Sequence, residues 1–534
     1  MKPALQGPAP VLIVGAGPSG LMMAAQLLRY GIQPIIIDNR PGPTQHSKAL
    51  AVQARSLEIY RQLGIADAVI PNGKPAQGLH FNVGGKPKAT FPLHDIGEGY
   101  TPYPFIHIYQ QHKNERALVD YLTQNNCPVY WNTTLTTLQQ GTGVVSATLK
   151  LAEEEYHLTC NWLIGADGAH STVRKQLQIP FTGDTYTHQF YLADVVLDEV
   201  DDFVNLYLSS RGFTAFFPMP EAGAYRVLGN LPDQLAQKVD LALNDVLPRI
   251  QRITRKPLQV QQVNWFTTYR LHHRMADEFQ QGRCFLIGDA AHIHSPVGGQ
   301  GMNTGLQDAY NLAWKLAGVI RKQLPSTILS SYQAERMPIA EQLLKTTDRA
   351  FTLVMSRHWW ARVFKRWILP LLLKRAWKSP KLRFTFFKQI SQTGISYVHS
   401  PLSLHLSHLQ DIKAGDRLPY FTIYDDKNQQ ETDLHAWCNT PGFTLITLGQ
   451  VQEQPMLNLT QWLTQNYPDR LHYHHLSPSV KNQQAFNAFE ISPGQAKAVI
   501  VRPDLYIGLL SDTLDVEILD NYLRNVVGLV SLKS

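Results

Sequence analysis

Short apolar runs recur along the chain, and three of them end abruptly at glycine. Val11–Val14 precedes Gly15, Trp162–Ile164 precedes Gly165, and Cys284–Ile287 precedes Gly288. Such runs are typical of buried strands, and the longer amphipathic stretches that follow the turns predict helices. Repeated strand, glycine turn and helix indicate an α/β fold built on a Rossmann-like parallel sheet.

The first of these units carries a dinucleotide fingerprint. Gly15, Gly17 and Gly20 form its turn, Leu21–Tyr30 is the predicted helix, and a second strand ends at Asp38. Glycines admit a pyrophosphate to the helix N-terminus, and an acid about 20 residues on takes a ribose hydroxyl. Arg40 is a further candidate contact. The fingerprint alone does not tell one dinucleotide from another.

Between residues 185 and 275 the pattern changes to short strands separated by turns. Apolar and aromatic runs occur at 191–197, 204–208, 214–217, 225–228 and 260–266. This spacing predicts an antiparallel sheet inserted between two halves of the dinucleotide-binding domain.

Composition narrows the class of protein. A chain of 534 residues needs several domains, and 44% hydrophobic with 17% charged residues fits a globular enzyme. Its four cysteines form no Cys-x-x-Cys pattern, which predicts free thiols and a cytoplasmic location. Glycines interrupt the N-terminal apolar run, so we expect no signal peptide.

The sequence predicts no metal site. The histidines at 272–273, 292 and 294 have no carboxylate or cysteine at a spacing typical of metal ligands.

The formal charge of +7 is local. Residues 357–383 contain nine Lys or Arg and no acid, so the rest of the chain has 7 − 9 = −2. We therefore expect no nucleic-acid partner.

The aromatic, basic stretch 345–400 has two interpretations. The simpler one is a helical segment that links domains or packs on a partner subunit, and the other is a segment that touches an anionic membrane.

Three motifs occur in a recognisable order. Gly288-Asp289-Ala-Ala-His292 is followed by Pro296, Gly299-Gln-Gly301-Met302-Asn303 and Asp308. Gly165-Ala-Asp167-Gly168 and a helix start at Gln111-x-x-x-Glu115-x-x-Leu118 precede them. Together with the fingerprint, they resemble the flavin-dependent aromatic hydroxylases, the single-component FAD monooxygenases built like para-hydroxybenzoate and phenol hydroxylase.

The resemblance assigns roles at an FAD site. Asp289 would hold the ribitol chain, Pro296 would lie beside the reactive edge of the flavin, and the backbone of Gly301–Asn303 would face its pyrimidine side. Asp167 would contact the pyrophosphate or cap the helix near Ser171. The other FAD candidates are Gly15, Gly17, Gly20, Asp38, Arg40, Lys48 (where the family usually has Arg), Arg55, Gln111, Gly288 and Gly299.

The resemblance also implies an activity. NAD(P)H would reduce FAD, O2 would give a flavin hydroperoxide, and its distal oxygen would hydroxylate an aromatic substrate, phenolic or polyketide-like. The catalytic candidates are Pro296, Tyr225 and Arg270. Tyr191, Phe217, Tyr269, His272 and His273 are further candidates to meet the substrate. A flavin halogenase is a rival, but its Trp-x-Trp-x-Ile-Pro motif is missing from the sequence. A flavoprotein that shields a reactive intermediate or a partner without turnover remains open.

The resemblance extends to the order of domains. We expect an FAD-binding domain in two parts (1–182 and 281–345), a substrate-binding β-sheet domain (183–280), a helical segment (346–402) and a thioredoxin-like C-terminal domain (403–534). Cys438 is the only cysteine of the last domain, so no dithiol chemistry is expected there. A homodimer is plausible by resemblance. The substrate, the regiochemistry, the phenol base and the choice of NADH or NADPH stay open.

Overall fold

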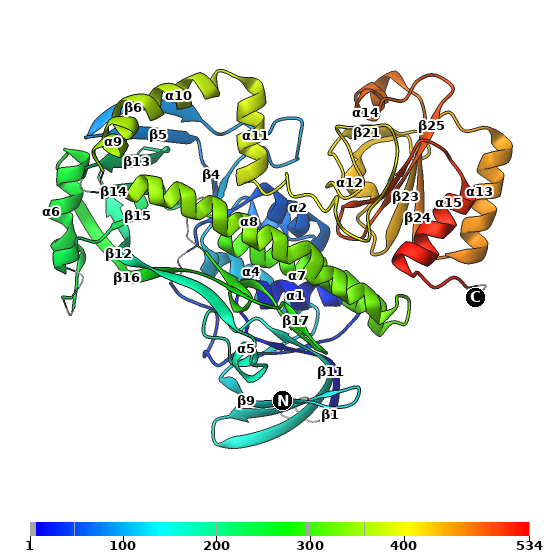
Figure 1. Ribbon diagram of the computed structural model, residues 1–534, viewed down its shortest axis with the longest axis horizontal. Helices are drawn as coiled ribbons and strands as arrows, with labels where there is room; N and C mark the ends of the chain where they lie inside the picture. The colour runs from blue at the N-terminus through cyan, green and yellow to red at the C-terminus, as the bar shows by residue number, and fades with distance from the viewer. Residues whose placement is uncertain are drawn as a thin grey trace.

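The computed structural model describes residues 7–46, 49–198, 201–210, 212–235, 237–238, 240–294, 299–356 and 358–532. A parallel sheet forms the base of the molecule (Figure 1). Its strands lie in the order β18 (Cys284–Leu286), β11 (Glu154–Gly165), β1 (Gly7–Val14), β2 (Ile35–Ile37) and β8 (Val129–Tyr130). The short β17 (Gln280–Gln281) pairs antiparallel with β18. The predicted Rossmann-like sheet is thereby confirmed.

Helices bury the apolar side chains of this sheet. The main ones are α1 (Pro18–Arg29), α2 (Ala54–Leu63), α4 (Gln111–Gln124), α7 (Gly301–Ile320) and α8 (Ser330–Met355). Gly31 and Gly64 follow the ends of α1 and α2, and both have the left-handed φ that ends a helix easily (68° and 74°). Helix α7 is buried along nearly its whole length and so forms the centre of the molecule. Short elements complete this part: α3 (Ala66–Val69), α5 (Thr172–Gln176) and a small sheet of β3 (Ala51–Val52), β7 (His107–Ile108) and β4 (Lys74–Pro75).

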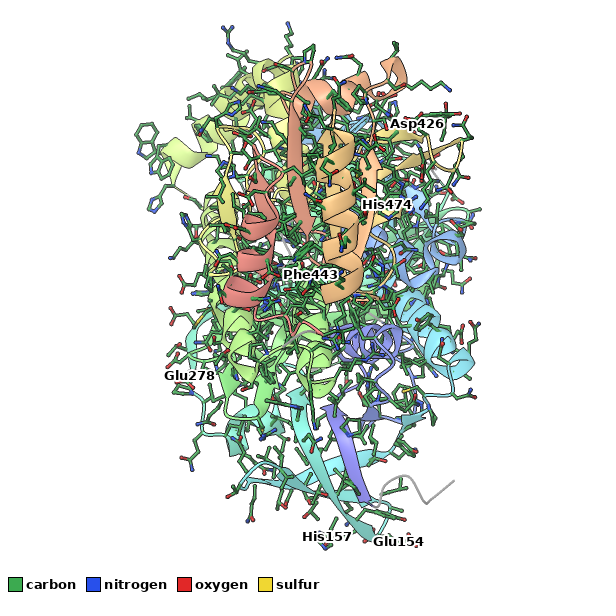
Figure 2. The ribbon with its side chains drawn as sticks, turned by 90° about the vertical axis from the view of Figure 1, so that its right-hand side faces the viewer. Glu154, His157, Glu278, Asp426, Phe443 and His474 are labelled. Atoms are coloured by element: carbon green, nitrogen blue, oxygen red, sulfur yellow. The ribbon has the colours of Figure 1, made fainter. Side chains whose placement is uncertain are left out.

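A long arm extends from the parallel sheet. Strands β9 (Thr133–Gln140) and β10 (Val145–Leu151) pair antiparallel with each other and with the first half of β11. Figure 2 shows Glu154 and His157 at the tip of this arm, at the opposite end of the molecule from Asp426 and His474.

The inserted sheet has eight strands. Their order is β19 (His292–Ile293), β16 (Val260–Ala276), β12 (Phe181–Leu197), β15 (Ala224–Asn230), β14 (Gly212–Pro218), β13 (Val204–Ser209), β5 (Gly78–Val83) and β6 (Lys86–Pro92). The predicted strands and their antiparallel pairing are confirmed. Strands β5 and β6, however, come from the first 182 residues, because β5 pairs parallel with β13. The sheet is therefore not one continuous segment of the chain.

Helices cover both faces of the inserted sheet (Figure 1). Helix α6 (Leu243–Thr254) packs on one face. On the other lie the end of α8, α9 (Trp359–Val363), a π-helical turn (Phe364–Ile368), α10 (Leu369–Trp377) and α11 (Pro380–Ile390), which we call the roof helices. No helix in the described ranges is long and apolar enough to cross a membrane.

The C-terminal domain has its own core and a five-stranded mixed sheet. The strand order is β20 (Leu404–Leu406), β26 (Ile507–Ser511), β25 (Ala496–Val501), β23 (Phe443–Gly449) and β24 (Leu471–Leu476). Helix α13 (Glu453–Asn466) joins the parallel strands β23 and β24, and β25 and β26 form an antiparallel pair, as expected for a thioredoxin-like domain. The remaining elements are β21 (Thr422–Asp425), β22 (Gln430–Asp433), α12 (Leu434–Trp437), α14 (Gln483–Ala488), α15 (Val516–Asn521) and a π-helical turn (Tyr522–Val527).

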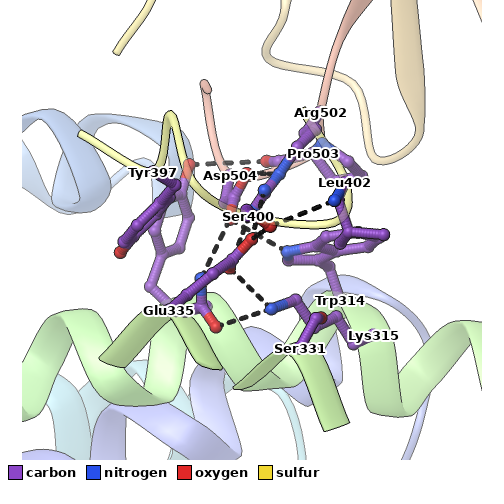
Figure 3. Close-up of polar contacts among 12 residues, drawn as sticks. Trp314, Lys315, Ser331, Glu335, Tyr397, Ser400, Leu402, Arg502, Pro503 and Asp504 are labelled. Atoms are coloured by element: carbon purple, nitrogen blue, oxygen red, sulfur yellow. Dashed lines mark hydrogen bonds and ion pairs between the residues drawn. The ribbon is translucent and has the colours of Figure 1, made fainter. Parts of the chain in front are cut away.

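Buried charges join this domain to the rest of the molecule (Figure 3). Glu335 on α8 accepts hydrogen bonds from both terminal nitrogens of Arg502 (2.6 and 3.0 Å) and from the Lys315 amine (2.7 Å). Arg502 also pairs with Asp504 (2.6 Å), and Asp504 accepts from the Trp314 indole (3.0 Å). Four of these side chains are charged and completely buried: two are positive (Lys315 and Arg502) and two are negative (Glu335 and Asp504). We call them the interdomain charge network.

Candidate cofactor and substrate site

The three glycine turns meet at one edge of the parallel sheet. Val14 pairs with Gly165, and Gly165 pairs with Leu286 on its other side, so the three strands end in register. The Ala166 amide donates to the Val14 carbonyl (2.8 Å), and the Ile287 amide donates to the Gly165 carbonyl (3.0 Å). In open α/β sheets, ligands bind outside this carboxyl edge.

The first turn leaves room for an anion. Gly15 has φ +106°, and a side chain there would collide with the backbone of Ala166. Gly17 has an ordinary extended conformation (φ −74°) and caps α1, yet a Cβ at this position would meet nothing within 4 Å. Open space at the N-terminus of a long helix is the feature a diphosphate requires, because unpaired backbone N–H groups point into it.

Asp38 lies at the end of β2 beside this turn. Its carboxylate accepts from the Ala16 amide (2.7 Å) and from the Arg40 guanidinium (3.0 Å), and Arg40 also donates to the Ala16 carbonyl (3.0 Å). The carboxylate is therefore fixed where the sequence predicts a ribose contact. Glu115 supports the arrangement from α4, where it accepts from Gln111 (2.9 Å).

A groove of about 1130 Å³ borders the same corner. Residues 40–45 form one wall, and the outer side of α4 forms the other. The groove adjoins Arg40 and does not lie under the inserted sheet. Its lining includes Arg40 but neither Asp38 nor the glycines of the first turn.

Asp167 caps α5. Its carboxylate accepts from the Ser171 hydroxyl (2.5 Å) and from the amides of Thr172 and Val173 (2.6 and 3.1 Å). Burial raises the pKa of this carboxyl, and these hydrogen bonds act in the opposite direction. The structure therefore confirms the capping role and places Asp167 next to the first glycine turn.

The second FAD motif packs tightly against the first. A Cβ on either Gly288 or Gly305 would collide with the hydroxyl of Ser19 on α1. Gly288 also needs its left-handed φ of +58°. This contact brings the exposed Asp289 to the start of α1, where the ribitol role would require it.

A buried ion cluster fixes that strand end. Asp308 accepts from the Gly288 amide (3.1 Å), pairs with His292 (2.7 Å) and pairs with Arg336 (2.7 Å). Burial alone would raise the pKa of Asp308, but Arg336 and His292 outweigh it and lower that pKa to about 2. The sequence marked Asp308 as part of the motif but gave no sign of Arg336, which lies on the next helix.

The N-terminus of α7 is held by Asn303. Its side-chain amide donates to the carbonyls of Ala51 and Gly299 (3.0 and 2.9 Å), and its oxygen accepts from the Gln53 amide (2.9 Å). Gly301 and Met302 form the first turn of the helix, whose amides have no partner within the helix. Lys48 and Pro296, two predicted site residues, lie outside the described residues.

Arg55 is not at the diphosphate. Its guanidinium is fully buried, pairs with Glu58 (2.9 Å) and donates to the backbone carbonyl of Asp504 (2.7 Å) in the C-terminal domain. It also lies over the rings of Tyr310 and Tyr506. The predicted cofactor role is therefore wrong, because the partners of this side chain come from the domain interface.

One face of the inserted sheet adjoins the cofactor motifs. Asp194 and Arg226 lie opposite each other on β12 and β15 and form a bidentate pair with both distances 2.8 Å. Arg226 reaches the carbonyl of Ala49 (3.3 Å) and lies over Trp265. Ala49 is two residues from Ala51, to which Asn303 is bound, so this face looks toward the N-terminus of α7.

The predicted substrate residues do not all lie on the same face of the inserted sheet. Tyr269 and Phe217 lie on the side of the sheet that adjoins the motifs and the roof helices. Tyr225 and Tyr191 point the opposite way, into the core under α6, and the Tyr225 hydroxyl donates to the Asp201 carbonyl (2.6 Å). Arg270 is exposed. The catalytic role predicted for Tyr225 is therefore wrong, because its side chain lies on the far face of the sheet, and the role of Arg270 stays a prediction.

Comparisons with known proteins agree with this geometry. The family model described as "FAD binding domain" matches residues 8–347. This chain belongs to that FAD-binding family. Residues 444–529 match the model described as "Phenol hydroxylase, C-terminal dimerisation domain", which confirms the predicted branch of the family.

Individual relatives are oxygenases. The chain is 36% identical to 6-methylpretetramide 4-monooxygenase of Streptomyces rimosus over 67% of its own length and 64% of the relative's. It is 34% identical to pentachlorophenol 4-monooxygenase of Sphingobium chlorophenolicum over 66% of each chain. These matches thus span slightly less than two thirds of each relative. The solved structure of OxyS anhydrotetracycline hydroxylase from Streptomyces rimosus superposes with a TM-score of 0.79 over 98% of this chain and all of that one, at 26% identity.

The residues present fit FAD. The open space at Gly17, the fixed carboxylate of Asp38 and the exposed carboxylate of Asp289 suit its diphosphate, ribose and ribitol groups. The first turn of α7 has backbone N–H groups without a partner in the helix, which would suit the polar edge of its ring. Within the described ranges, no group of three or more His, Cys, Asp or Glu side chains is arranged to hold a metal ion.

Proposed function

We propose that this chain is an FAD-dependent monooxygenase that uses NAD(P)H and O2 to hydroxylate an aromatic substrate, phenolic or polyketide-like. The observation that carries the proposal is the position of the FAD motifs beneath an aromatic sheet face with helices over it. The names of the oxygenase relatives support it. The two-part FAD-binding domain expected at 1–182 and 281–345 supplies the motifs, and the sheet expected at 183–280 supplies the facing wall, with β5 and β6 added to it.

When bound, FAD supplies the redox and oxygen-transfer chemistry, and the chain supplies position and environment. The Gly15–Gly20 turn and α1 would hold the diphosphate, Asp38 the ribose and Asp289 the ribitol. The first-turn amides of α7 would stabilise negative charge on the pyrimidine side of the ring. The resemblance assigns the ring's reactive edge to Pro296, which lies outside the described residues.

The inserted sheet would hold the substrate. Tyr269 and Phe217 offer flat apolar surface to an aromatic ring, and the roof helices exclude water from that side. The Asp194–Arg226 pair lies on the same face and is almost completely buried. We expect it to orient polar groups of the substrate, because a fixed buried ion pair presents its charges in one direction.

Two further properties belong to this proposal. The match to a dimerisation domain supports a homodimer formed through the C-terminal domain. Four free, buried cysteines support a cytoplasmic location.

The test is NAD(P)H oxidation and oxygen uptake by the flavin-loaded protein, with and without a panel of phenols, naphthoquinols and phenolic antibiotics. The proposal expects one compound to accelerate oxidation and to gain one oxygen atom by mass. Protein that binds FAD and a panel compound tightly, yet never oxidises NAD(P)H faster with it, would be a shielding protein and not a monooxygenase. Failure to take up FAD would overturn the site itself.

A further inference from the structure

The roof helices carry an unusual concentration of exposed apolar side chains. Of the seventeen large hydrophobic residues that are exposed in the described ranges, nine lie between residues 359 and 386. Trp359, Trp367 and Leu371 are 71%, 62% and 68% exposed. A contiguous exposed apolar patch on a folded protein marks a surface that binds something.

These side chains form one stripe along α9 and α10. Trp360, Val363, Trp367 and Leu371 follow one another at intervals of three and four residues, which is the spacing of one helix face. Trp359, Ile368 and Leu372 widen the stripe. We call these seven side chains the α9–α10 face. The stretch Trp359–Trp377 is about 28 Å long at 1.5 Å per helical residue.

The exposure does not come from a loose segment. The opposite side of α10 packs on the inserted sheet, where Leu369, Leu373 and Trp377 contact the cluster around Phe91. The Phe91 and Trp377 rings lie 5.0 Å apart. Along α10, the α9–α10 face is therefore a second apolar side on a helix that already buries a first one.

The charged side chains of α9 and α10 themselves have one sign. Between Asp348 and Asp411 the sequence contains no acidic residue. Arg366, Lys374, Arg375 and Lys378 are all exposed beside the stripe. Basic residues that flank an aromatic and aliphatic stripe are the composition of a helix that lies in the interface of an anionic bilayer.

A second copy of the chain fits this face poorly. A symmetric contact would place the same basic side chains opposite one another without an acid between them, and like charges across an interface are repelled. An anionic lipid surface offers phosphate to the basic groups and acyl chains to the tryptophans.

We propose that the α9–α10 face docks the protein on the surface of an anionic membrane. The helices lie in the plane of the surface with the tryptophans at the headgroup level, and the roof side of the substrate sheet is turned toward the lipid. The docking rests on the outer side chains of α9 and α10 and does not depend on the proposed activity.

The test is co-sedimentation of the full-length, FAD-loaded protein with vesicles of phosphatidylcholine alone or with added phosphatidylglycerol. We expect binding to the anionic vesicles only, and weaker binding at high salt. The triple variant Trp360→Ser, Trp367→Ser and Leu371→Ser should lower the partition coefficient at least tenfold at any salt concentration. The variant Lys374→Gln, Arg375→Gln and Lys378→Gln should lose the preference for anionic lipid.

Matched controls separate this face from general hydrophobicity and charge. Leu457→Ser with Val480→Ser removes exposed apolar side chains elsewhere, and Lys175→Gln, Lys427→Gln and Lys481→Gln remove three exposed charges elsewhere. Both controls should bind vesicles as the unchanged protein does. Flavin absorbance and melting temperature report that every variant is folded.

Two results would overturn the proposal. One is that the protein without substitutions does not bind anionic vesicles. If the serine variant then changes the tendency of the protein to self-associate, the α9–α10 face would be a contact between copies of the chain and not a membrane surface. The other is binding that the α9–α10 variants and the controls affect equally. Neither result concerns NAD(P)H oxidation, which is measured with water-soluble phenols in the absence of vesicles and tests the proposed function separately.

Discussion

Replacing Glu335 by glutamine should weaken the junction between the FAD-binding part and the C-terminal domain. The side chain keeps its size but loses its charge, so Arg502 and Lys315 are left with one carboxylate, Asp504, in a fully buried site. Burial alone would raise the pKa of Glu335, but Arg502 and Lys315 lower it, and so the residue is ionised at neutral pH. Removing one partner from a buried ion pair typically costs about 3–5 kcal/mol.

The assay is proteolysis of the native protein without denaturant. Cleavage follows the population of opened molecules when closing is fast, so this cost should raise the cleavage rate roughly 100- to 4,000-fold. The matched control is Glu341→Gln on the same helix. Its pair with Lys345 (3.4 Å) is exposed, and its loss should cost less than about 1 kcal/mol.

A second variant separates charge balance from lost hydrogen bonds. Adding Lys315→Met to Glu335→Gln removes one positive and one negative charge, which leaves Arg502 balanced by Asp504. The double variant should therefore be cleaved more slowly than the single one. The reasoning fails if Glu335→Gln behaves like Glu341→Gln, or if Lys315→Met makes the single variant worse.

Three further predictions concern the cofactor site and the buried ion cluster beside it. Gly17→Ala should leave the apoprotein stable, because the new Cβ meets no atom within 4 Å. It should weaken FAD binding about 10- to 100-fold in a fluorescence titration, because the Cβ would occupy the space of the diphosphate. An unchanged affinity would show that no diphosphate passes there. Gly20→Ala should instead lower the melting temperature of the apoprotein, because its Cβ collides with the Gly15 carbonyl. The pKa of Asp308 is lowered to about 2, so its stabilisation of about 2–3 kcal/mol is present above pH 4 and lost as the pH falls toward 2. The slope of the unfolding free energy against pH below pH 4 reports how many protons are taken up on unfolding. Asp308→Asn should lower that number by up to one, and an unchanged slope would contradict the assignment.

The sequence predicted the cofactor motifs well because their geometry is local. A strand, a glycine turn and a helix follow one another directly, so Gly15, Gly165 and Gly288 could be placed at strand ends from spacing alone. Arg55 was misassigned because its partners are not local: Asp504 is 449 residues away in the chain. A basic residue next to a motif has no feature in the sequence that tells a cofactor contact from a domain contact.

The substrate wall could be predicted as a sheet but not as a site. Strand β15 is buried at almost every position, since α6 covers one face and the roof helices cover the other. Alternation along such a strand carries no sign of which face meets the ligand. That is why Tyr225 and Tyr269 looked alike in the sequence although they point to opposite sides. The contribution of β5 and β6 was hidden for a similar reason, because β5 pairs with a strand 125 residues later in the chain.

The burial of all four cysteines makes the protein unusually suited to site-directed labelling. Cys127, Cys160, Cys284 and Cys438 are at most 3% exposed, and burial raises the pKa of Cys127 to about 11 and of the other three to about 12. The thiolate is the species that attacks maleimides and iodoacetamides, so these side chains should react slowly in the folded state. A single cysteine introduced at an exposed position would be the only fast-reacting thiol, and a fluorescent or spin probe could be attached there without first removing any native residue.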